Sequence, residues 1–449
     1  MNRPNILYIH SHDTGRYIRP YGYAAPTPRL QQLAEEGVLF RQAFSAAPTC
    51  SPSRACLLTG QFAHNNGMLG LAHRGFSLDD YDRHLVHTLR DAGYHTTLVG
   101  VQHVARRSEQ IGYDQLFAQG SMAGHRHPHP AQKDQNAPSA GEVVAGAAEF
   151  LQNAPAQPFF LSVGFYETHR EYQPATPDDN PNYVQPPAHL PDRPETRRDM
   201  ADFHASARLL DQSVGAVLDL LESEGLAENT LVIATTDHGL AMPGMKCTLY
   251  DRGIGVLLIM RGPGGFSGGR VVDAMVSHLD VFPTLCDYLG IDPPNWLQGR
   301  SIMPLIRGET DAINEAVFAE VNYHAAYEPQ RVVRTDRWKY IRRFDGRERP
   351  VLPNVDDSLS KDVWLAHGWR ERSVAGEELY DLIFDPGETN NLAGDPRAQE
   401  ALKAMRARLE RWMAETEDPL LRGPIPAPPG AVYNDPDGLS PGEPTLTAA

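Results

Sequence analysis

One stretch of the sequence brings together side chains that could bind and attack an anion. It runs from Cys50 to Gly60 and reads Cys-Ser-Pro-Ser-Arg-Ala-Cys-Leu-Leu-Thr-Gly. Pro52 predicts that a helix begins near Cys50, because proline is favoured in the first helical turn. Free N–H groups and the positive end of the helix dipole would then favour an anion at Cys50, and Arg54 can turn its guanidinium toward the same point. A lone cysteine near a helix start is usually a buried apolar side chain, but this combination predicts a nucleophile loop with a surface-facing thiol.

The Cys-x-Pro-x-Arg pattern followed by Leu-Thr-Gly resembles the signature of the sulfatase family. In that family the cysteine is oxidised after translation to formylglycine, an aldehyde whose hydrate is the nucleophile. The continuation from His64 to Leu71, His-Asn-Asn-Gly-Met-Leu-Gly-Leu, is most similar to the heparan N-sulfatase (sulfamidase) branch. The resemblance implies an alkaline phosphatase superfamily fold, a divalent cation, and a formylglycine-generating enzyme that modifies Cys50.

Two carboxylates that follow apolar runs are candidate metal ligands. Asp13 comes after the first run and Asp237 after a later one, and oxygen donors at neighbouring strand ends can hold one divalent cation beside Cys50. Such carboxylates also cap helices, but the nearby nucleophile loop favours the metal. By resemblance, Asp13 matches the second of two adjacent metal-binding aspartates, whereas His12 replaces the first. Calcium is the metal that the family resemblance implies. Imidazole ligands would make the site softer than an all-oxygen site, so manganese and zinc also stay open. The predicted ligands are His12, Asp13, Cys50, Asp237 and His238.

Histidines and a lysine with motif context are candidates for proton transfer and sulfate binding. His103 follows a predicted strand, and His169 lies in a stretch similar to the family's Pro-His element; a histidine near neutral pKa suits transfer of a proton. Lys246 lies in a segment similar to the Lys-x-Thr-x-Tyr element, whose lysine contacts the sulfate. The resemblance implies that Asp237 is the base on the attacking hydroxyl, His169 the acid for the leaving group, and His103 the base that expels sulfate. The predicted catalytic residues are Cys50, Arg54, His103, His169, Asp237 and Lys246.

One family cation is missing from the sequence. Many sulfatases carry a lysine in Gly-Lys-x-His, where this chain has valine at position 101. Arg16, Arg106 or Arg170 could supply the charge. Sulfamidases place substrate contacts at the positions of Glu320 and His324, so the predicted substrate-binding residues are Arg170, Glu320 and His324.

Short apolar runs alternate with helical segments over the first two thirds of the chain. The predicted strands are 6–9, 96–101, 159–163 and 231–234, with helices near 28–36 and 85–89. This alternation predicts an α/β fold with a large, mostly parallel mixed sheet flanked by helices, in which functional groups gather at the carboxyl ends of the strands.

The composition changes after about residue 307, which predicts three parts. Residues 1–307 form the catalytic domain, and residues 308–418 a smaller α+β subdomain with strands 317–321, 331–340 and 378–382 and a helix at 399–415. Residues 419–449 are a Pro- and Gly-rich tail that we expect to be irregular. Long loops at 120–138 and 172–194 lie beside the active face, and His125, His127 and His129 in the first are interpreted as solvated surface rather than a metal tract.

The overall composition limits partners and location. There are 41 basic and 57 acidic residues, giving a formal charge of −16, which argues against nucleic-acid binding and requires local cations at an anion site. Four cysteines without metal-ligand spacing argue against a disulfide framework. No apolar run approaches the roughly 20 residues of a membrane span, and the first predicted strand begins too early for a signal peptide, so we expect a cytoplasmic protein. The oligomeric state, including a homo-oligomer, stays open.

The resemblance to sulfatases, together with the residues above, implies a hydrolase that removes sulfate from a small anionic substrate, either a sulfate ester or a sulfamate of an N- or O-sulfated sugar. The first alternative is a phosphodiester or phosphonate monoester hydrolase of the same superfamily. Phosphate favours a more highly charged metal site, so the histidine at position 12 argues against it. The second alternative is a degenerate protein that only binds anionic sugars, which the retained catalytic set argues against.

Overall fold

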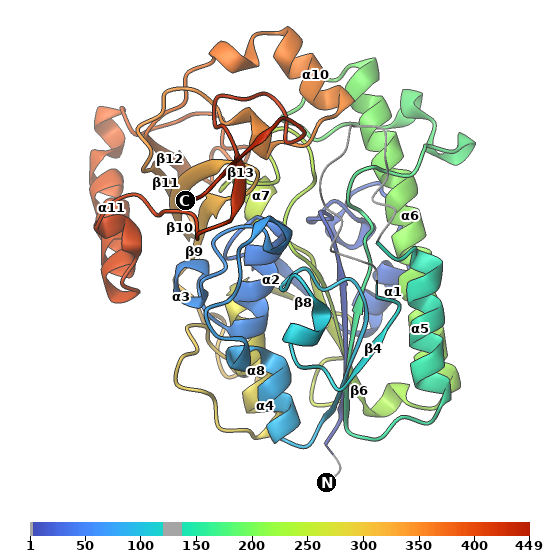
Figure 1. The fold of residues 1–449 in the computed structure, drawn as a ribbon. Coiled ribbons are helices and arrows are strands. Elements are labelled where there is room, and N and C mark those ends of the chain that lie inside the picture. Colours follow the sequence, from blue (N-terminus) through green and yellow to red (C-terminus); the bar gives the residue numbers. More distant parts are fainter. Residues whose placement is uncertain (1–2, 120–136) are drawn as a thin grey trace.

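The computed structural model describes residues 3–119 and 137–449, so His125, His127 and His129 lie outside the described residues. Its centre is an eight-stranded sheet in the order β4-β3-β5-β1-β6-β7-β2-β8 (Figure 1). All neighbouring strands are parallel except β7, which is antiparallel to both β6 and β2. The strands are β1 Asn5–Ser11, β2 Val38–Phe44, β3 His95–Gly100, β4 Gln115–Phe117, β5 Phe159–Gly164, β6 Thr230–Thr236, β7 Leu258–Arg261 and β8 Arg270–Ser277. The predicted large, mostly parallel mixed sheet is confirmed.

Helices cover both faces of this sheet (Figure 1). Strand β1 is buried along its whole length, and its successive side chains enter opposite cores: Ile6 and Tyr8 pack on one face, Leu7 and Ile9 on the other. The first core includes α2 Cys50–Thr59, α4 Leu85–Asp91 and α8 Val281–Leu289; the second includes α1 Pro28–Glu36, α5 Ala140–Gln152 and α6 Pro194–Ser223.

A separate four-stranded antiparallel sheet follows in the order β12-β11-β10-β9. Helix α11 Gln399–Glu415 packs on it through Leu402, Leu409 and Trp412. The predicted single strand over 331–340 is wrong, because Thr335 exchanges hydrogen bonds with Trp338 and closes a turn there. The strands are β9 Ala316–Tyr323, β10 Tyr327–Thr335, β11 Trp338–Arg343 and β12 Glu377–Asp381, and the remaining helices are α3 Ala63–Asn66, α7 Asp251–Ile254, α9 Met303–Arg307 and α10 Leu359–Ala366.

The chain after residue 418 is more regular than predicted. It contains a two-stranded ladder of β13 Val432–Asn434 and β14 Thr445–Thr447. Asn434 accepts a hydrogen bond from Arg74 at 2.9 Å and donates its backbone N–H to Ala325 at 2.7 Å. These contacts fix the tail against the rest of the protein.

The structure also bears on membrane-spanning helices and on the state of the cysteines. Within residues 3–119 and 137–449, no helix is long and apolar enough to cross a membrane. All four cysteines lie in the described part of the chain, and all are free and buried.

Candidate active site

Four predicted site residues lie at one edge of the large sheet. Asp13 follows β1, His103 follows β3, His169 follows β5 and Asp237 follows β6. These strands are direct neighbours in the order β3-β5-β1-β6, so their carboxyl ends present the four side chains side by side. Asp13 and His103 have φ angles of 53° and 61°, in the left-handed region that non-glycine residues rarely adopt. Such backbone conformations concentrate at functional sites.

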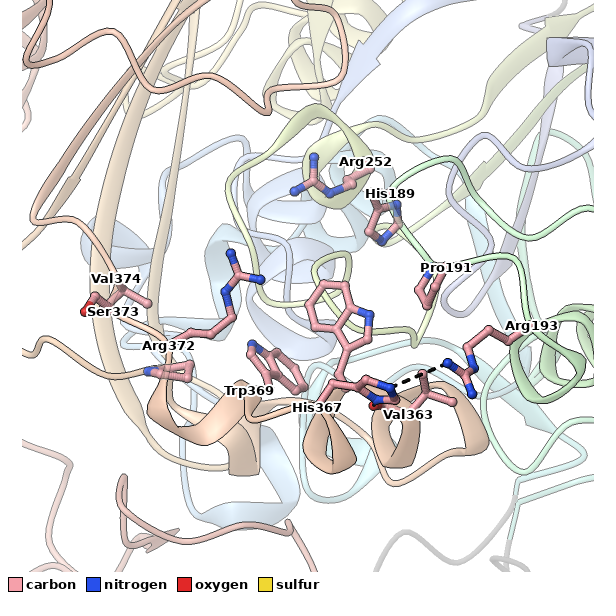
Figure 2. Close-up of a pocket in the computed structure, with 12 residues that line it drawn as sticks. His189, Pro191, Arg193, Arg252, Val363, His367, Trp369, Arg372, Ser373 and Val374 are labelled. Carbon is pink, nitrogen blue, oxygen red and sulfur yellow. Dashed lines mark hydrogen bonds between the residues drawn. The ribbon is translucent and has the colours of Figure 1, made fainter.

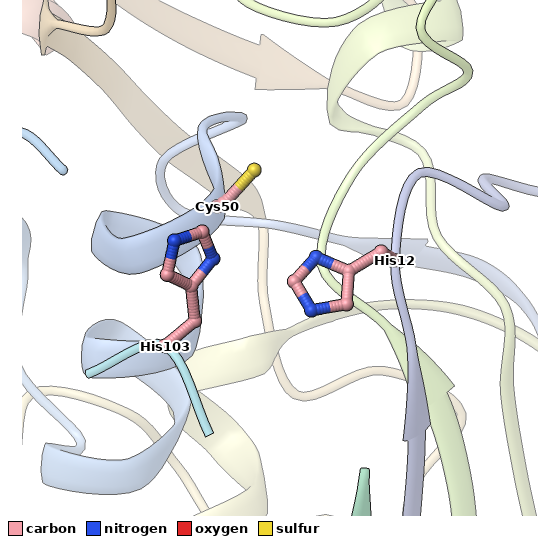
Figure 3. Close-up of side chains that lie close together, drawn as sticks. All are labelled: His12, Cys50 and His103. Carbon is pink, nitrogen blue, oxygen red and sulfur yellow. The ribbon is translucent and has the colours of Figure 1, made fainter. Parts of the chain in front are cut away.

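Cys50 is the first residue of helix α2 and points into this edge (Figure 3). Its Sγ lies 3.4 Å from His238 Nε2 and 4.0 Å from Asp13 Oδ1. The expectation of a surface-facing thiol is wrong: only 1% of Cys50 is exposed, because the strand-end loops close over the helix start. Burial raises the pKa of the thiol well above its usual value, against the opposing effect of Lys246.

The residues predicted to bind a metal form a compact donor set. Ligand atoms of His12, Asp13, Cys50 and Asp237 lie within 4.8 Å of one another, and all four residues are buried. Both ring nitrogens of His12 are buried without a hydrogen-bond partner among the described residues. The Nδ1 atom of His238 lies 2.9 Å from Gly239 O, and its Nε2 lies 3.3 Å from Asp13 Oδ1. Closely spaced lone pairs and carboxylates of this kind fit a bound cation.

Arg54 connects the helix start to two strand ends. It donates to Asp237 Oδ2 at 3.0 Å, to Ser11 O at 2.8 Å and to His10 Nδ1 at 2.6 Å. Burial acts to raise the pKa of Asp237, but His238 and Arg54 outweigh burial and hold that pKa well below the usual range. Asp237 is therefore a carboxylate near neutral pH, suited to be a ligand or hydrogen-bond acceptor.

Lys246 lies between two carboxylates. Its Nζ is 3.0 Å from Asp13 Oδ2 and 3.0 Å from Asp356 Oδ2. Burial acts to lower the pKa of Lys246, but the two aspartates dominate and raise it well above its usual value. The side chain of Lys246 is 2% exposed and that of Asp356 is 20% exposed, so Asp356 forms the solvent-facing end of this ion pair.

Sequence reasoning missed Asp356. It precedes the N-cap of α10, where acidic residues are common as helix caps, and it comes from a segment more than a hundred residues beyond Lys246. Burial opposes ionisation of Asp356, yet the neighbouring ammonium of Lys246 holds its pKa well below the usual range. Only the tertiary contact with Lys246 reveals this residue.

The predicted proton-transfer histidines are both in the cluster. His169 Nε2 lies 4.0 Å from Asp13 Oδ2, while its Nδ1 is 2.5 Å from the Arg170 carbonyl oxygen. The ring of His103 lies 5.4 Å from that of His12 (Figure 3), and its Nε2 is 3.2 Å from His73 Nδ1, a neighbour that sequence reasoning also missed.

His324, predicted to contact substrate, is a buried neighbour of the cluster. Burial, followed by Lys246, lowers the pKa of its imidazole well below the usual value, so the ring is neutral. It therefore offers the site a polar but uncharged group.

The other two residues predicted to bind substrate, Arg170 and Glu320, both have partners inside the protein. Arg170 forms a bidentate pair with Asp199 at 2.7 and 2.8 Å and donates Nε to Ala241 O at 2.7 Å. Glu320 is fully buried, with Oε1 2.8 Å from His64 Nδ1 and Oε2 3.2 Å from Arg331 Nη2. Spacing alone could not show that these charges are already neutralised by internal partners.

Comparison with known proteins agrees with this geometry. The family model described as sulfatase matches residues 4–291, and the one described as N-sulphoglucosamine sulphohydrolase, C-terminal, matches residues 244–354. N-sulphoglucosamine sulphohydrolase of Homo sapiens is 31% identical over 94% of this chain and 92% of its own length. Delta 4,5-hexuronate-2-O-sulfatase of Bacteroides thetaiotaomicron is 26% identical over 93% and 90%.

Solved structures show the same fold at lower identity. One, in complex with its substrate D-glucosamine-2-N,6-O-disulfate, has a TM-score of 0.74 at 20% identity and covers 93% of this chain and 98% of its own. The phosphonate monoester hydrolase of Agrobacterium radiobacter has a TM-score of 0.67 at 22% identity and covers 92% and 96%. Since the sulfatase model covers more than half of the chain and the human relative nearly all of it, the chain belongs to the sulfatase family and is a sulfuric ester hydrolase.

Proposed function

We propose that this sulfatase removes sulfate from a small sulfated sugar, with the sulfamate of N-sulfated glucosamine as its preferred bond and an O-sulfate ester as the second choice. The observation that carries the proposal is the position of Cys50, 3.4 Å from His238 Nε2 and 4.0 Å from Asp13 Oδ1 at a helix start. The match to the C-terminal model of N-sulphoglucosamine sulphohydrolase and the human relative support the choice of bond.

The proposed reaction needs a formylglycine at residue 50 and a divalent cation, and the residues of the cluster suit both. Cys50 is converted by a formylglycine-generating enzyme, and the resulting aldehyde, once hydrated, supplies the nucleophilic hydroxyl. His12, Asp13, residue 50 and Asp237, with His238 beside them, would hold a divalent cation, which would supply Lewis-acid polarisation of the sulfate oxygens. Calcium is the first metal to test. The imidazole of His12 makes manganese and zinc the next two.

Cationic side chains bind and orient the sulfate in this account. Arg54 and Lys246 both reach the carboxylates around Cys50, so their charges lie where a sulfate enters. Charge stabilisation is the largest catalytic contribution in transfers of this kind. Asp356 holds the Lys246 ammonium from the solvent side and limits its movement.

Two histidines handle protons. The Nδ1 of His169 contacts a backbone carbonyl, which leaves Nε2 facing the cluster as the atom that would transfer a proton to the leaving nitrogen or oxygen. The ring of His103 lies 5.4 Å from that of His12, and in this proposal it accepts a proton from the hydroxyl that remains on residue 50. Valine at 101 leaves this side of the site without the usual lysine.

A substrate panel tests the proposal. Metal-supplemented protein with converted Cys50 should release sulfate from glucosamine N-sulfate fastest, from glucosamine 6-O-sulfate more slowly, and only weakly release nitrophenol from bis(4-nitrophenyl) phosphate. Preference for the phosphodiester would overturn the proposal in favour of a phosphohydrolase. No turnover of any ester by fully converted protein would indicate a binding protein.

We also propose a cytoplasmic location for the mature protein. The four free, buried cysteines support a reducing compartment, where disulfides are rare. Fractionation of the native host checks this, and recovery of the protein outside the cytoplasm would contradict it.

A further inference from the structure

A second pocket, separate from the catalytic cluster, has a volume of 530 Å³ (Figure 2). It is lined by segments just before and at the start of α6, by α7, and by α10 with the residues that follow it. Its lining is rich in cations and aromatic rings, and no acidic residue occurs among the described lining residues. The characteristic members are Arg193, Arg252, Arg372, His189, His367, Trp364 and Trp369. In a chain of net charge −16, such a lining suits an anionic ligand.

The three arginines approach the pocket from different sides (Figure 2). Arg193 lies 3.5 Å from His367 Nε2 and 3.8 Å from the nearest oxygen of its half-exposed neighbour Glu195. Arg252 donates to the carbonyl of Gly244, and its ion pair with Glu388 is long, at 3.7 Å. Arg372 is exposed. These charges are only loosely neutralised, and guanidinium groups match the planar or tetrahedral oxygens of carboxylate and sulfate.

The tryptophans supply flat apolar surfaces beside these charges. The rings of Trp364 and Trp369 are perpendicular, with centroids 4.7 Å apart, and both are partly exposed. Small-molecule sites commonly combine aromatic walls with a few polar groups that fix orientation. An indole face packs well against the C–H face of a sugar ring, while the arginines bind acidic substituents on that ring.

The pocket shares two walls with the catalytic cluster. Gly244 borders it so closely that a Cβ there would lie 3.4 Å from His189 and 3.5 Å from Trp364, and Lys246 follows only two residues later. The second wall is α10, which carries Trp364 and is preceded by Asp356, the partner of Lys246. A ligand in the pocket would therefore lie beside the segments that position the sulfate-binding lysine.

We propose that this pocket binds a second anionic sugar unit of an oligosaccharide substrate, through the arginines and the tryptophan faces. The substrate class rests on the proposed function. The recognised group is an acidic substituent of the sugar, either a sulfate or a carboxylate.

Equilibrium binding tests the pocket independently of turnover. In a Cys50→Ala background, intrinsic tryptophan fluorescence is titrated with an N-sulfated heparin tetrasaccharide, its desulfated form, which keeps the carboxylates, and neutral maltotetraose. Arg372→Ala should raise the Kd for the sulfated tetrasaccharide about tenfold, the loss expected for one charged contact. Trp369→Ala should also raise this Kd, because it removes an apolar face on which the sugar ring packs. Arg372→Lys should recover part of the affinity. Arg370→Ala is the matched control, because this exposed arginine in the same segment is not among the pocket residues.

The outcomes separate the two proposals. If desulfation abolishes the effect of Arg372→Ala, the pocket recognises sulfate, and if the effect persists, it recognises carboxylate. If both pocket variants bind the tetrasaccharide as Arg370→Ala does, or if maltotetraose binds equally well, the pocket proposal is overturned. Failure of the converted protein to hydrolyse sulfate esters would refute the proposed function while leaving these Kd values interpretable.

Discussion

Replacing Lys246 with methionine should have two separable effects, on stability and on catalysis. Its ammonium lies 3.0 Å from both Asp13 and Asp356, so Lys246→Met leaves two neighbouring carboxylates without their shared cation. Removing one partner of a buried ion pair costs about 3 to 5 kcal/mol. Because Asp356 is partly exposed, we expect the lower end of this range in metal-free protein. A bound cation should reduce the loss further, since it would neutralise Asp13.

A double-mutant cycle isolates this interaction. Asp356→Asn removes one of the carboxylates, so Lys246→Met should cost less stability in that background. We expect a coupling energy of about 1 to 3 kcal/mol from urea unfolding in the presence of chelator. A coupling below about 0.5 kcal/mol would refute the argument that Asp356 holds Lys246.

Catalysis provides the second readout. Loss of one charged hydrogen bond to sulfate, worth about 1.5 to 3 kcal/mol, should lower kcat/KM for 4-nitrophenyl sulfate by about tenfold to a hundredfold. Lys361→Met is the matched control, because Lys361 is also buried and paired with an aspartate, Asp357 at 2.8 Å, but belongs to α10 outside the cluster. It should lose stability without losing kcat/KM per folded molecule. Equal loss of kcat/KM in both variants would contradict a sulfate-binding role for Lys246.

Three further predictions address the nucleophile, the metal and pH. Cys50→Ala should abolish turnover, whereas Cys56→Ala, in the interior of α2, should cost about 1 kcal/mol of stability and keep turnover; equal loss of turnover would contradict the assignment. Chelation should lower Tm and turnover together, and added calcium should restore both, because the donor cluster would lose and regain its cation. No change in either quantity on chelation would contradict a metal ion in this cluster. Burial lowers the pKa of His84 to about 3, which is below its value in the unfolded chain. The unfolded state therefore binds more protons, and the free energy of unfolding falls as the pH drops below about 6.5. At pH 5 this residue should account for a loss of about 2 kcal/mol. His84→Asn keeps an N-cap acceptor and should flatten this slope in unfolding titrations; an unchanged slope would show that His84 does not contribute.

The strand-end residues were predictable because their positions follow from sheet geometry. Alternating strands and helices imply parallel strands, and parallel strands deliver Asp13, His169 and Asp237 to one edge. The Cys50 motif also encodes its own placement, since Pro52 and the helix dipole act within a single turn. Local rules were sufficient for both features.

Features that depend on distant partners were not predictable. The antiparallel strand β7 is short and lies between β6 and β2, two strands that are far apart in the sequence. Its direction is therefore set by tertiary pairing. Asp356 acquires its role only by meeting Lys246 across more than a hundred residues. Conversely, Arg170 and Glu320 were assigned to substrate because a single sequence does not reveal the buried partners that neutralise them.

The catalytic role of Cys50 is tested most directly by the rate of sulfate release as a function of the fraction of Cys50 converted to formylglycine. The protein is produced with graded amounts of a formylglycine-generating enzyme, the converted fraction is measured by mass spectrometry of the peptide containing Cys50, and release from glucosamine N-sulfate is measured on the same samples. We expect a rate proportional to the converted fraction and no turnover by the unmodified thiol. Full activity in unconverted protein would contradict this role.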